Sequence, residues 1–121
     1  MDKLVYGDFV WPQNPDRYEQ SYSRKPVYEK NSAGDMVFQG MSPLKRTITG
    51  GGIFSGTAAG ASFLRLAALC GQTEPKNLTH PVWGTVSAYL TELEMEQEPR
   101  ENFVTYRFTF QAADENGHIP Q

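Results

Sequence analysis

In the stretch from residue 103 to 112, apolar and polar side chains alternate from Val104 onward, a pattern that matches a half-buried β-strand and no amphipathic helix. Its large apolar residues are Val104, Tyr106, Phe108 and Phe110. The polar residues between them are Thr105, Arg107, Thr109 and Gln111. A strand with one such face must bury it against another layer, so this stretch commits the chain to a β-rich, layered core.

A second long strand is predicted from Thr85 to about Glu98, followed by a turn at residues 99–102. Its apolar residues change parity: Val86, Ala88 and Leu90 share one parity, whereas Leu93 and Met95 share the other. Side chains in a strand alternate with a period of two, so a change of parity needs one extra residue. We therefore expect a β-bulge near Leu90–Glu92.

Four more strand regions precede these two. They are Leu4–Trp11, Tyr18–Lys30, Met36–Gly40 and Leu44–Thr49. Gly7 breaks the first of them, and the second and third are predicted to pair with each other as a hairpin. Pro26 marks an edge or a bulge within that hairpin, because proline cannot donate a hydrogen bond to a ladder.

One helix is predicted, from Ala58 to Cys70. Its packing face combines residues at helical spacing: Phe63, Leu66, Ala67 and Cys70. Leu64 and Leu69 widen the apolar surface, so we expect the helix to be covered on most sides by its own sheet or by a partner. Ser55 or Thr57 is predicted to cap its start, and Gly71 to end it in a left-handed conformation.

These elements predict a mainly β protein with one α-helix: a small antiparallel β-barrel or sandwich capped by a single apolar helix. At 121 residues the chain is expected to form a single domain over 1–121. We expect an ordered core from about residue 4 to 113 and a frayed polar C-terminal tail over 114–121.

Composition narrows the classes of function. The formal net charge is −3, and the densest basic groups are only pairs, Arg24-Lys25 and Lys45-Arg46, which argues against a nucleic-acid surface. Cys70 is the single cysteine, so no intrachain disulfide forms and a reducing cytoplasm is the expected environment. We expect no signal peptide, and the longest apolar run falls short of the ~20 residues that cross a bilayer.

Two features invite a catalytic interpretation, and neither supports one. Gly50-Gly51-Gly52 lacks the Lys and Ser/Thr of a phosphate-binding loop, so a bulge or tight crossover between strand and helix is expected instead. His80 has no neighbouring nucleophile or second metal ligand, and is expected to be a structural histidine in a tight loop that Trp83 anchors to the core. The sequence predicts no enzyme, no metal and no cofactor.

An acidic row forms the third candidate feature: Glu92, Glu94, Glu96 and Glu98. Their spacing of two places them on one face of a strand. One interpretation is a solvated face that discourages edge-to-edge aggregation. The other is an acidic surface that faces a basic partner or the lumen of a tube.

The block Leu78-Thr79-His80-Pro81-Val82-Trp83-Gly84 resembles the L-x-H-P-x-x-G signature in the N-terminal domain of the phage DNA-circulation protein family, whose members belong to tails of contractile phages and related particles. Arg46-x-Ile48-x-Gly50 resembles the strand that leads into the helix in these proteins. The resemblance spans residues 9–113. Family members often continue into a long C-terminal region, whereas this chain stops after the predicted hairpin, which implies a stand-alone tail or baseplate piece.

The resemblance implies a structural component of a phage or phage-like tail or baseplate, acting by subunit docking or ring assembly near the hub. Implied partners are other tail proteins and further copies of the chain, and implied locations are the bacterial cytoplasm during assembly and then the virion tail. The motif residues become a structural corner: Leu78, His80, Pro81, Trp83 and Gly84. Two alternatives stay open, a DNA-handling role that follows the family name and a small-ligand-binding β-barrel.

Overall fold

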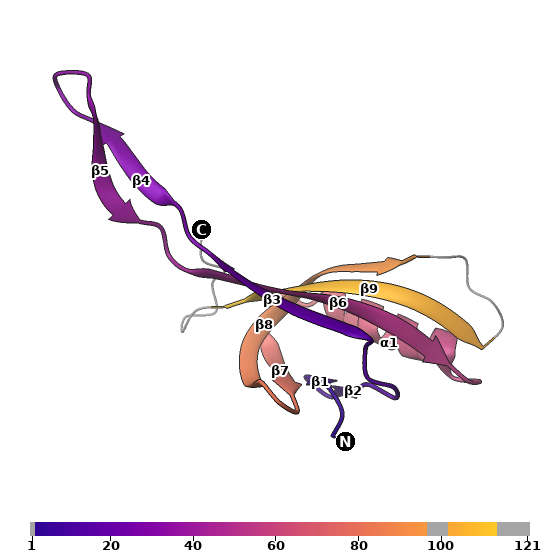
Figure 1. Cartoon of the computed structure of the whole chain (residues 1–121). Helices are drawn as coiled ribbons and strands as arrows, with labels where there is room; N and C mark the ends of the chain where they lie inside the picture. Colours follow the sequence, from indigo (N-terminus) through magenta and orange to yellow (C-terminus); the bar gives the residue numbers. More distant parts are fainter. Residues whose placement is uncertain (1, 97–101, 114–121) are drawn as a thin grey trace.

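A curved antiparallel sheet and a separate hairpin make up the fold. The computed structural model describes residues 2–96 and 102–113 (Figure 1). Seven strands form the sheet in the order β2-β1-β7-β8-β9-β6-β3. Their bounds are β1 Val5–Tyr6, β2 Phe9–Val10, β3 Arg17–Ser23, β6 Lys45–Ser55, β7 Lys76–His80, β8 Gly84–Met95 and β9 Phe103–Ala112. The hairpin pairs β4 (Pro26–Lys30) with β5 (Met36–Met41).

The prediction of a mainly β fold with one helix is confirmed. The sheet is sandwich-like and does not close into a barrel, because β2 and β3 are its two edges and do not pair with each other. The helix α1 (Ala59–Cys70) packs against one face of β6, β8 and β9. Within the described residues, no helix has the length and apolar character needed to span a membrane.

The predicted strand over 103–112 is confirmed as β9, and its apolar face is the centre of the core. All four predicted inward residues of β9 are buried. On this face Phe54 of β6 stacks on Tyr106, with ring centroids 4.3 Å apart. The predicted bulge is confirmed too, since the register of β8 against β9 shifts between Leu90 and Glu92. Strong periodicity thus located both strands of this pair.

The N-terminal segment closes the core from the other side. The predicted single strand Leu4–Trp11 is instead a tight hairpin of β1 and β2, and Gly7 turns between them at a φ of +60°. The Trp11 indole Nε1–H donates to the Tyr106 hydroxyl at 2.9 Å, and the Tyr6 hydroxyl donates to the Ala88 carbonyl at 2.9 Å. Burial raises the pKa of Tyr106 above its ordinary value. These bonds satisfy polar groups that the core would otherwise leave unpaired.

The predicted bulge or crossover at Gly50-Gly51-Gly52 is wrong. These glycines lie inside β6, in register with β9, and Gly50 and Gly51 also pair with β3. A Cβ on Gly50 would lie 2.2 Å from the Arg17 carbonyl oxygen, and one on Gly51 would lie 2.5 Å from the Tyr106 carbonyl oxygen. Close approach of neighbouring backbones, rather than a bend, explains why this strand uses glycine.

The predicted hairpin of Tyr18–Lys30 with Met36–Gly40 is only half right. Its outer part forms β4–β5, but its first part is β3, which pairs with β6 over its full length. A narrow neck separates the two pairings: the Lys25 N–H donates to the Ser42 hydroxyl and the Ser42 N–H to the Lys25 carbonyl, both at 2.7 Å. The hairpin therefore leaves the sheet as an arm, which projects away from the body (Figure 1).

The helix begins one residue later than predicted, and its ends differ from expectation. Neither Ser55 nor Thr57 caps it, because Ala58 is the N-cap residue and makes no side-chain capping bond. Gly71 ends the helix at a φ of −89°, outside the left-handed region; its N–H donates to the Ala68 carbonyl and the Gln72 N–H donates to the Leu69 carbonyl. The ends of α1 are thus closed mainly by backbone hydrogen bonds, including that from the Ala59 N–H to the Gly56 carbonyl at 3.1 Å.

Candidate assembly surfaces

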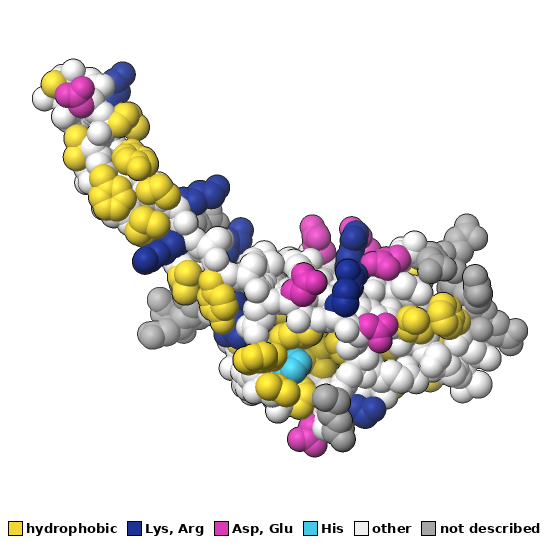
Figure 2. All heavy atoms as spheres, viewed as in Figure 1, with side chains coloured by type: hydrophobic (Ala, Val, Ile, Leu, Met, Phe, Trp, Pro, Cys, Tyr) yellow, Lys and Arg dark blue, Asp and Glu magenta, His cyan; other side chains and the backbone are white. Residues whose placement is uncertain are grey.

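The arm, defined here as β4, β5 and their connecting turn, is covered with exposed apolar side chains. Six large ones are between 39% and 64% exposed: Val27, Tyr28, Met36, Val37, Phe38 and Met41. Figure 2 shows them following the arm from neck to tip. An apolar surface of this kind on a folded protein marks an interaction site. The sequence predicted a hairpin here but not its exposure.

One side of the arm is a continuous apolar ribbon. Tyr28 pairs with Phe38, and their rings meet edge to face with centroids 5.9 Å apart. Pro26 lies two residues before Tyr28 on the same side of β4 and pairs with Met41, and a β-bulge between Val27 and Tyr28 adds one residue of β5 between the two pairs. Methionine and aromatic side chains adapt their shape to a partner surface and gain much on burial.

The tip of the arm is ordered by its own hydrogen bonds. The Asn31 side-chain oxygen accepts from the N–H groups of Ala33 and Asp35, at 3.0 and 2.9 Å. The Asn31 N–H donates to the Asp35 carbonyl at 2.8 Å, and Gly34 takes a φ of +90°. An isolated two-stranded hairpin is marginal in water, so this turn and the neck hold the arm in shape before a partner binds.

The basic charge near the arm lies at its neck, because the arm itself carries one basic and two acidic residues. Residues 24–46 contain five basic and two acidic residues, whereas the remaining sequence contains six basic and twelve acidic residues. The basic residues gather near the neck: Arg24, Lys25, Lys45 and Arg46. Complementary potentials steer association and fix its orientation.

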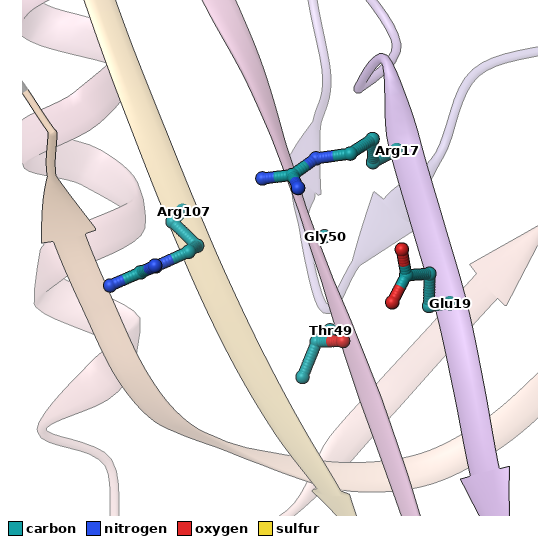
Figure 3. A pocket seen from close by; sticks show the side chains of 5 residues that line it. All are labelled: Arg17, Glu19, Thr49, Gly50 and Arg107. Carbon is teal, nitrogen blue, oxygen red and sulfur yellow. The ribbon is translucent and has the colours of Figure 1, made fainter.

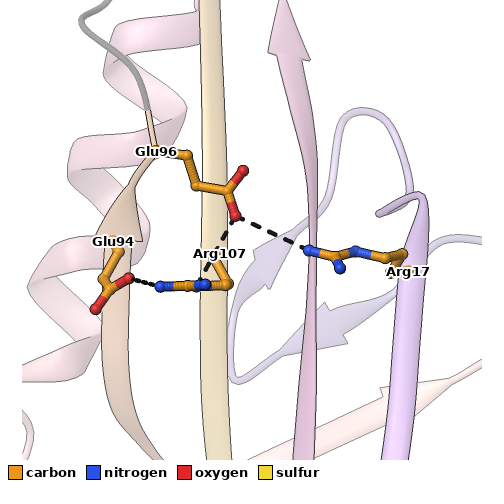
Figure 4. A network of polar contacts seen from close by, with 4 residues as sticks. All are labelled: Arg17, Glu94, Glu96 and Arg107. Carbon is orange, nitrogen blue, oxygen red and sulfur yellow. Dashed lines mark hydrogen bonds and ion pairs between the residues drawn. The ribbon is translucent and has the colours of Figure 1, made fainter.

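A second candidate surface is the open face of the sheet, opposite α1. There Arg107 of β9 is hydrogen-bonded to Glu94, and its Nε lies 3.8 Å from a Glu96 carboxylate oxygen (Figure 4). The hydrogen bond to Glu94 raises the pKa of Arg107. Arg17 reaches the same Glu96 oxygen at 3.9 Å from the far edge strand. Gly51 lies between them in the register and has no side chain to block the way.

This face carries shallow, open hollows. Arg17, Glu19, Thr49, Gly50 and Arg107 line one of about 100 Å³ (Figure 3), and a neighbouring one of about 250 Å³ is lined by residues that include Arg17, Gly51 and Glu96. Ligand sites for small molecules usually measure about 300–1,000 Å³ and are mostly apolar. A shallow polar hollow over a sheet suits contact with another surface rather than capture of a small molecule.

The acidic row predicted from sequence lies on this open face. Glu92, Glu94 and Glu96 are exposed, and the last two pair with arginines across the sheet. Glu98 lies outside the described residues. The sequence indicated the row itself, but not the guanidinium groups opposite it, because those come from strands distant in the chain.

The corner around His80 holds the turn between β7 and β8. Its Nδ1 accepts from the Val82 and Trp83 N–H groups at 3.0 and 3.2 Å, and its ring lies 4.3 Å from that of Tyr18. Burial lowers the pKa of His80. Gly84 turns the chain at a φ of +80°.

The remaining corner residues divide between core and surface. Leu78 is buried, Pro81 is half-buried, and Trp83 is 63% exposed. The expectation that Trp83 anchors the loop to the core is therefore wrong. Tyr18 and the backbone hydrogen bonds to His80 hold the loop instead.

The predicted packing face of α1 meets the core unevenly. Leu66 is fully buried, Phe63 and Cys70 are half-buried against the core, and Ala67 is half-buried. Leu64, on the outer side, is 69% exposed. The sheet thus covers one side of the helix, and the expectation that the helix is covered on most sides is not met within the described chain.

Comparisons with known proteins show the fold. No protein-family model and no curated protein matches the chain. One solved structure, titled as the virion of a native gene transfer agent particle, contains a chain 14% identical, with a TM-score of 0.55, covering 92% of this chain and 89% of that one. A second, the tail of an empty gene transfer agent particle computed with C6 symmetry, is 17% identical, with a TM-score of 0.49, covering 82% and 77%. Nothing in these comparisons points to the DNA-circulation family in particular.

Proposed function

We propose that the chain is a structural subunit of a phage or phage-like tail or baseplate, and that it assembles by docking its arm onto another copy of itself. The exposed apolar ribbon of the arm is the observation that carries the proposal. The likeness of the fold to a chain of a gene transfer agent virion supports the setting. We propose an architectural role for the subunit, at a position near the tail hub. Its assembly into the tail would take place in the bacterial cytoplasm.

A partner is needed because the arm buries nothing of its own. All of its strand residues apart from Gly40 are exposed, although a two-stranded hairpin gains little stability in isolation. Covering the ribbon would bury several large side chains that are about half exposed, each gaining roughly half of the about 1.5–3 kcal/mol of a full burial. An arm kept in shape but left uncovered is best explained by a surface on another molecule.

The charge distribution favours a second copy of this chain as that molecule. The basic neck below the arm attracts the acidic body of a neighbouring copy, whereas two necks repel each other. Such a contact is head-to-tail, with different patches on the two molecules. Head-to-tail contacts propagate into rings or stacks, which is the architecture of a tail.

The proposed DNA-handling role lacks a matching surface. The chain is acidic overall, and the described open face carries four glutamates against two arginines. The basic cluster at the neck is limited to four side chains, and one of them, Arg46, is hydrogen-bonded to Gln20. Phosphate contacts need clustered, unpaired cations. We therefore propose docking between subunits rather than DNA binding.

The test compares two double variants of the full chain. Tyr28→Ser with Phe38→Ser removes the centre of the apolar ribbon, and Val10→Ser with Leu64→Ser removes exposed apolar side chains of the body as a matched control. We expect wild type and control to form larger assemblies with rising concentration in sedimentation velocity, and the arm variant to stop at smaller assemblies than both, with an unchanged thermal melt. Unchanged assembly of the folded arm variant would contradict the proposal.

The setting is tested separately, in a bacterium that produces the chain. An epitope-tagged copy should co-purify with tail-bearing particles and be visible in them by immunogold electron microscopy. A copy that remains wholly outside such particles would rule out the tail setting even if arm docking were confirmed.

A further inference from the structure

We infer that neighbouring copies also join side by side, by antiparallel pairing of β3 of one copy with the second half of β8 of the next. Repetition of this contact closes a ring whose wall is one continuous sheet. The inference rests on the proposed self-assembling role and identifies a second interface, distinct from the arm.

Both edges are available in the described part of the chain. β3 is the last strand of the sheet, and it pairs only with β6 over its seven residues. β7 covers β8 only from Gly84 to Ala88, so from Leu90 onward β8 has β9 as its single partner. A long edge strand leaves a row of backbone N–H and C=O groups without ladder partners, which is a template for pairing with another chain.

The strand directions suit this pairing. β3, β6, β9 and β8 alternate in direction from one neighbour to the next. β3 and β8 therefore run in opposite directions at the two sides of this four-stranded unit. A β3 strand added beside β8 lies antiparallel to it, which is the slightly more stable arrangement.

The side chains place an arginine on the β3 edge and a row of glutamates on the β8 edge. One row of the register runs across the open face from Arg17 through Gly51 and Arg107 to Glu94. Arg17 lies on the β3 edge, with its guanidinium turned inward to Glu96 of its own copy, and the glutamates lie along the β8 edge (Figure 4). Pairing β3 with β8 brings unlike charges together, whereas β8 with β8 opposes like charges.

Glu19 restricts the register of the contact. It lies two residues after Arg17 on the same face of β3, and an unstaggered contact would set it opposite Glu92. Closing a sheet into a ring requires a stagger between strands. A stagger of two residues sets Arg17 opposite Glu92 and moves Glu19 away from the acidic row toward Thr91.

Cysteine cross-linking tests the contact directly. In a Cys70→Ala background, Glu19→Cys and Thr91→Cys place thiols on the two edges, near each other across the contact in either register. Within one chain these residues lie about three strand spacings, or ~14 Å, apart, so an intrachain disulfide cannot form. We expect a ladder of covalent multimers on a non-reducing gel, ending at a closed ring. Each single-cysteine variant should stop at a dimer.

Charge reversal tests the register. Arg17→Glu should weaken lateral self-association at least tenfold, and Glu92→Arg in the same chain should restore it. Arg65→Glu makes the same change of charge on α1, away from both edges, and should have little effect. An Arg17→Glu variant that associates like Arg65→Glu, with wild-type circular dichroism, would overturn the pairing.

Different outcomes would contradict the two proposed interfaces. If edge pairing is correct, the cross-linked ladder also forms in the Tyr28→Ser and Phe38→Ser arm variant. If no ladder forms while the arm still drives assembly, the edge contact is wrong and the proposed function stands. If the ladder forms and the arm variant still builds full-length stacks, docking by the arm is wrong and the edge contact stands.

Discussion

The imidazole of His80 lies against the ring of Tyr18, with centroids 4.3 Å apart, and so connects the β7–β8 turn to an edge strand on the far side of the sheet. The Nδ1 of His80 accepts two backbone N–H groups, which requires that this nitrogen carry no proton. The neutral His80 side chain thus holds the β7–β8 turn in shape and also packs against β3. This relationship makes the corner sensitive to pH.

The unfolding free energy should fall as pH drops below about 6.5, the ordinary pKa of histidine. The pKa of His80 is lowered in the folded state, so the unfolded chain takes up the proton first and stability rises with pH across this window. Urea unfolding at about pH 7.5 and pH 5.5 measures the change. His80→Asn keeps an acceptor for the turn but does not titrate there, so its stability should depend less on pH; an equal dependence would place the effect elsewhere.

Removing the hydroxyl of Tyr106 should cost about 1–3 kcal/mol of unfolding free energy. The Tyr106→Phe variant keeps the ring stacked on Phe54 but leaves the buried indole N–H of Trp11 without its acceptor. Tyr22→Phe is the control, since that tyrosine is exposed. Chemical denaturation monitored by tryptophan fluorescence gives both values, and equal stability of the two variants would count against the bond.

Adding one methyl group to β6 should be far more damaging than adding one to α1. Gly50→Ala places a carbon against the Arg17 carbonyl and the Phe108 ring, so we expect β3 to be displaced, at a cost of about 2 kcal/mol or more. Gly60→Ala meets nothing within 4 Å and should stabilise the helix by roughly 0.5–1 kcal/mol. Thermal melts rank the two, and a reversed order would contradict the close packing at β6.

The two leucines on opposite sides of α1 should respond differently to truncation. Leu66→Ala opens a cavity beneath the helix and should cost about 2–5 kcal/mol. Leu64→Ala removes a mostly exposed side chain and should change stability by less than about 0.5 kcal/mol. Urea unfolding measures both. A large loss at Leu64 would show that a second surface covers it even in the purified protein.

Sequence alone predicted the features that depend on neighbouring residues. The alternation over 103–112 located β9, and the parity change located the bulge in β8, because a strand's period of two leaves no freedom. The pairing of β3 with β6 and the meaning of the three glycines were missed. Both depend on which backbones approach from elsewhere in the chain.

The candidate surfaces also combine features that the local sequence indicates with features that depend on distant strands. The acidic row was visible as a spacing, whereas Arg17 and Arg107 meet it only through the register of four strands. The hairpin of the arm was predicted, but its exposure was missed because its apolar residues have the composition of a half-buried strand. Composition cannot tell whether the surface that buries such residues belongs to the same molecule.

The separation of the arm from the core has an evolutionary consequence. The six large apolar side chains on it are all exposed, so their replacement leaves the buried core intact. Substitutions and changes of length in the arm have little effect on folding, so selection acts on them only through binding to the partner. The arm is therefore the segment through which descendants of this chain can exchange one neighbour for another while inheriting the same body.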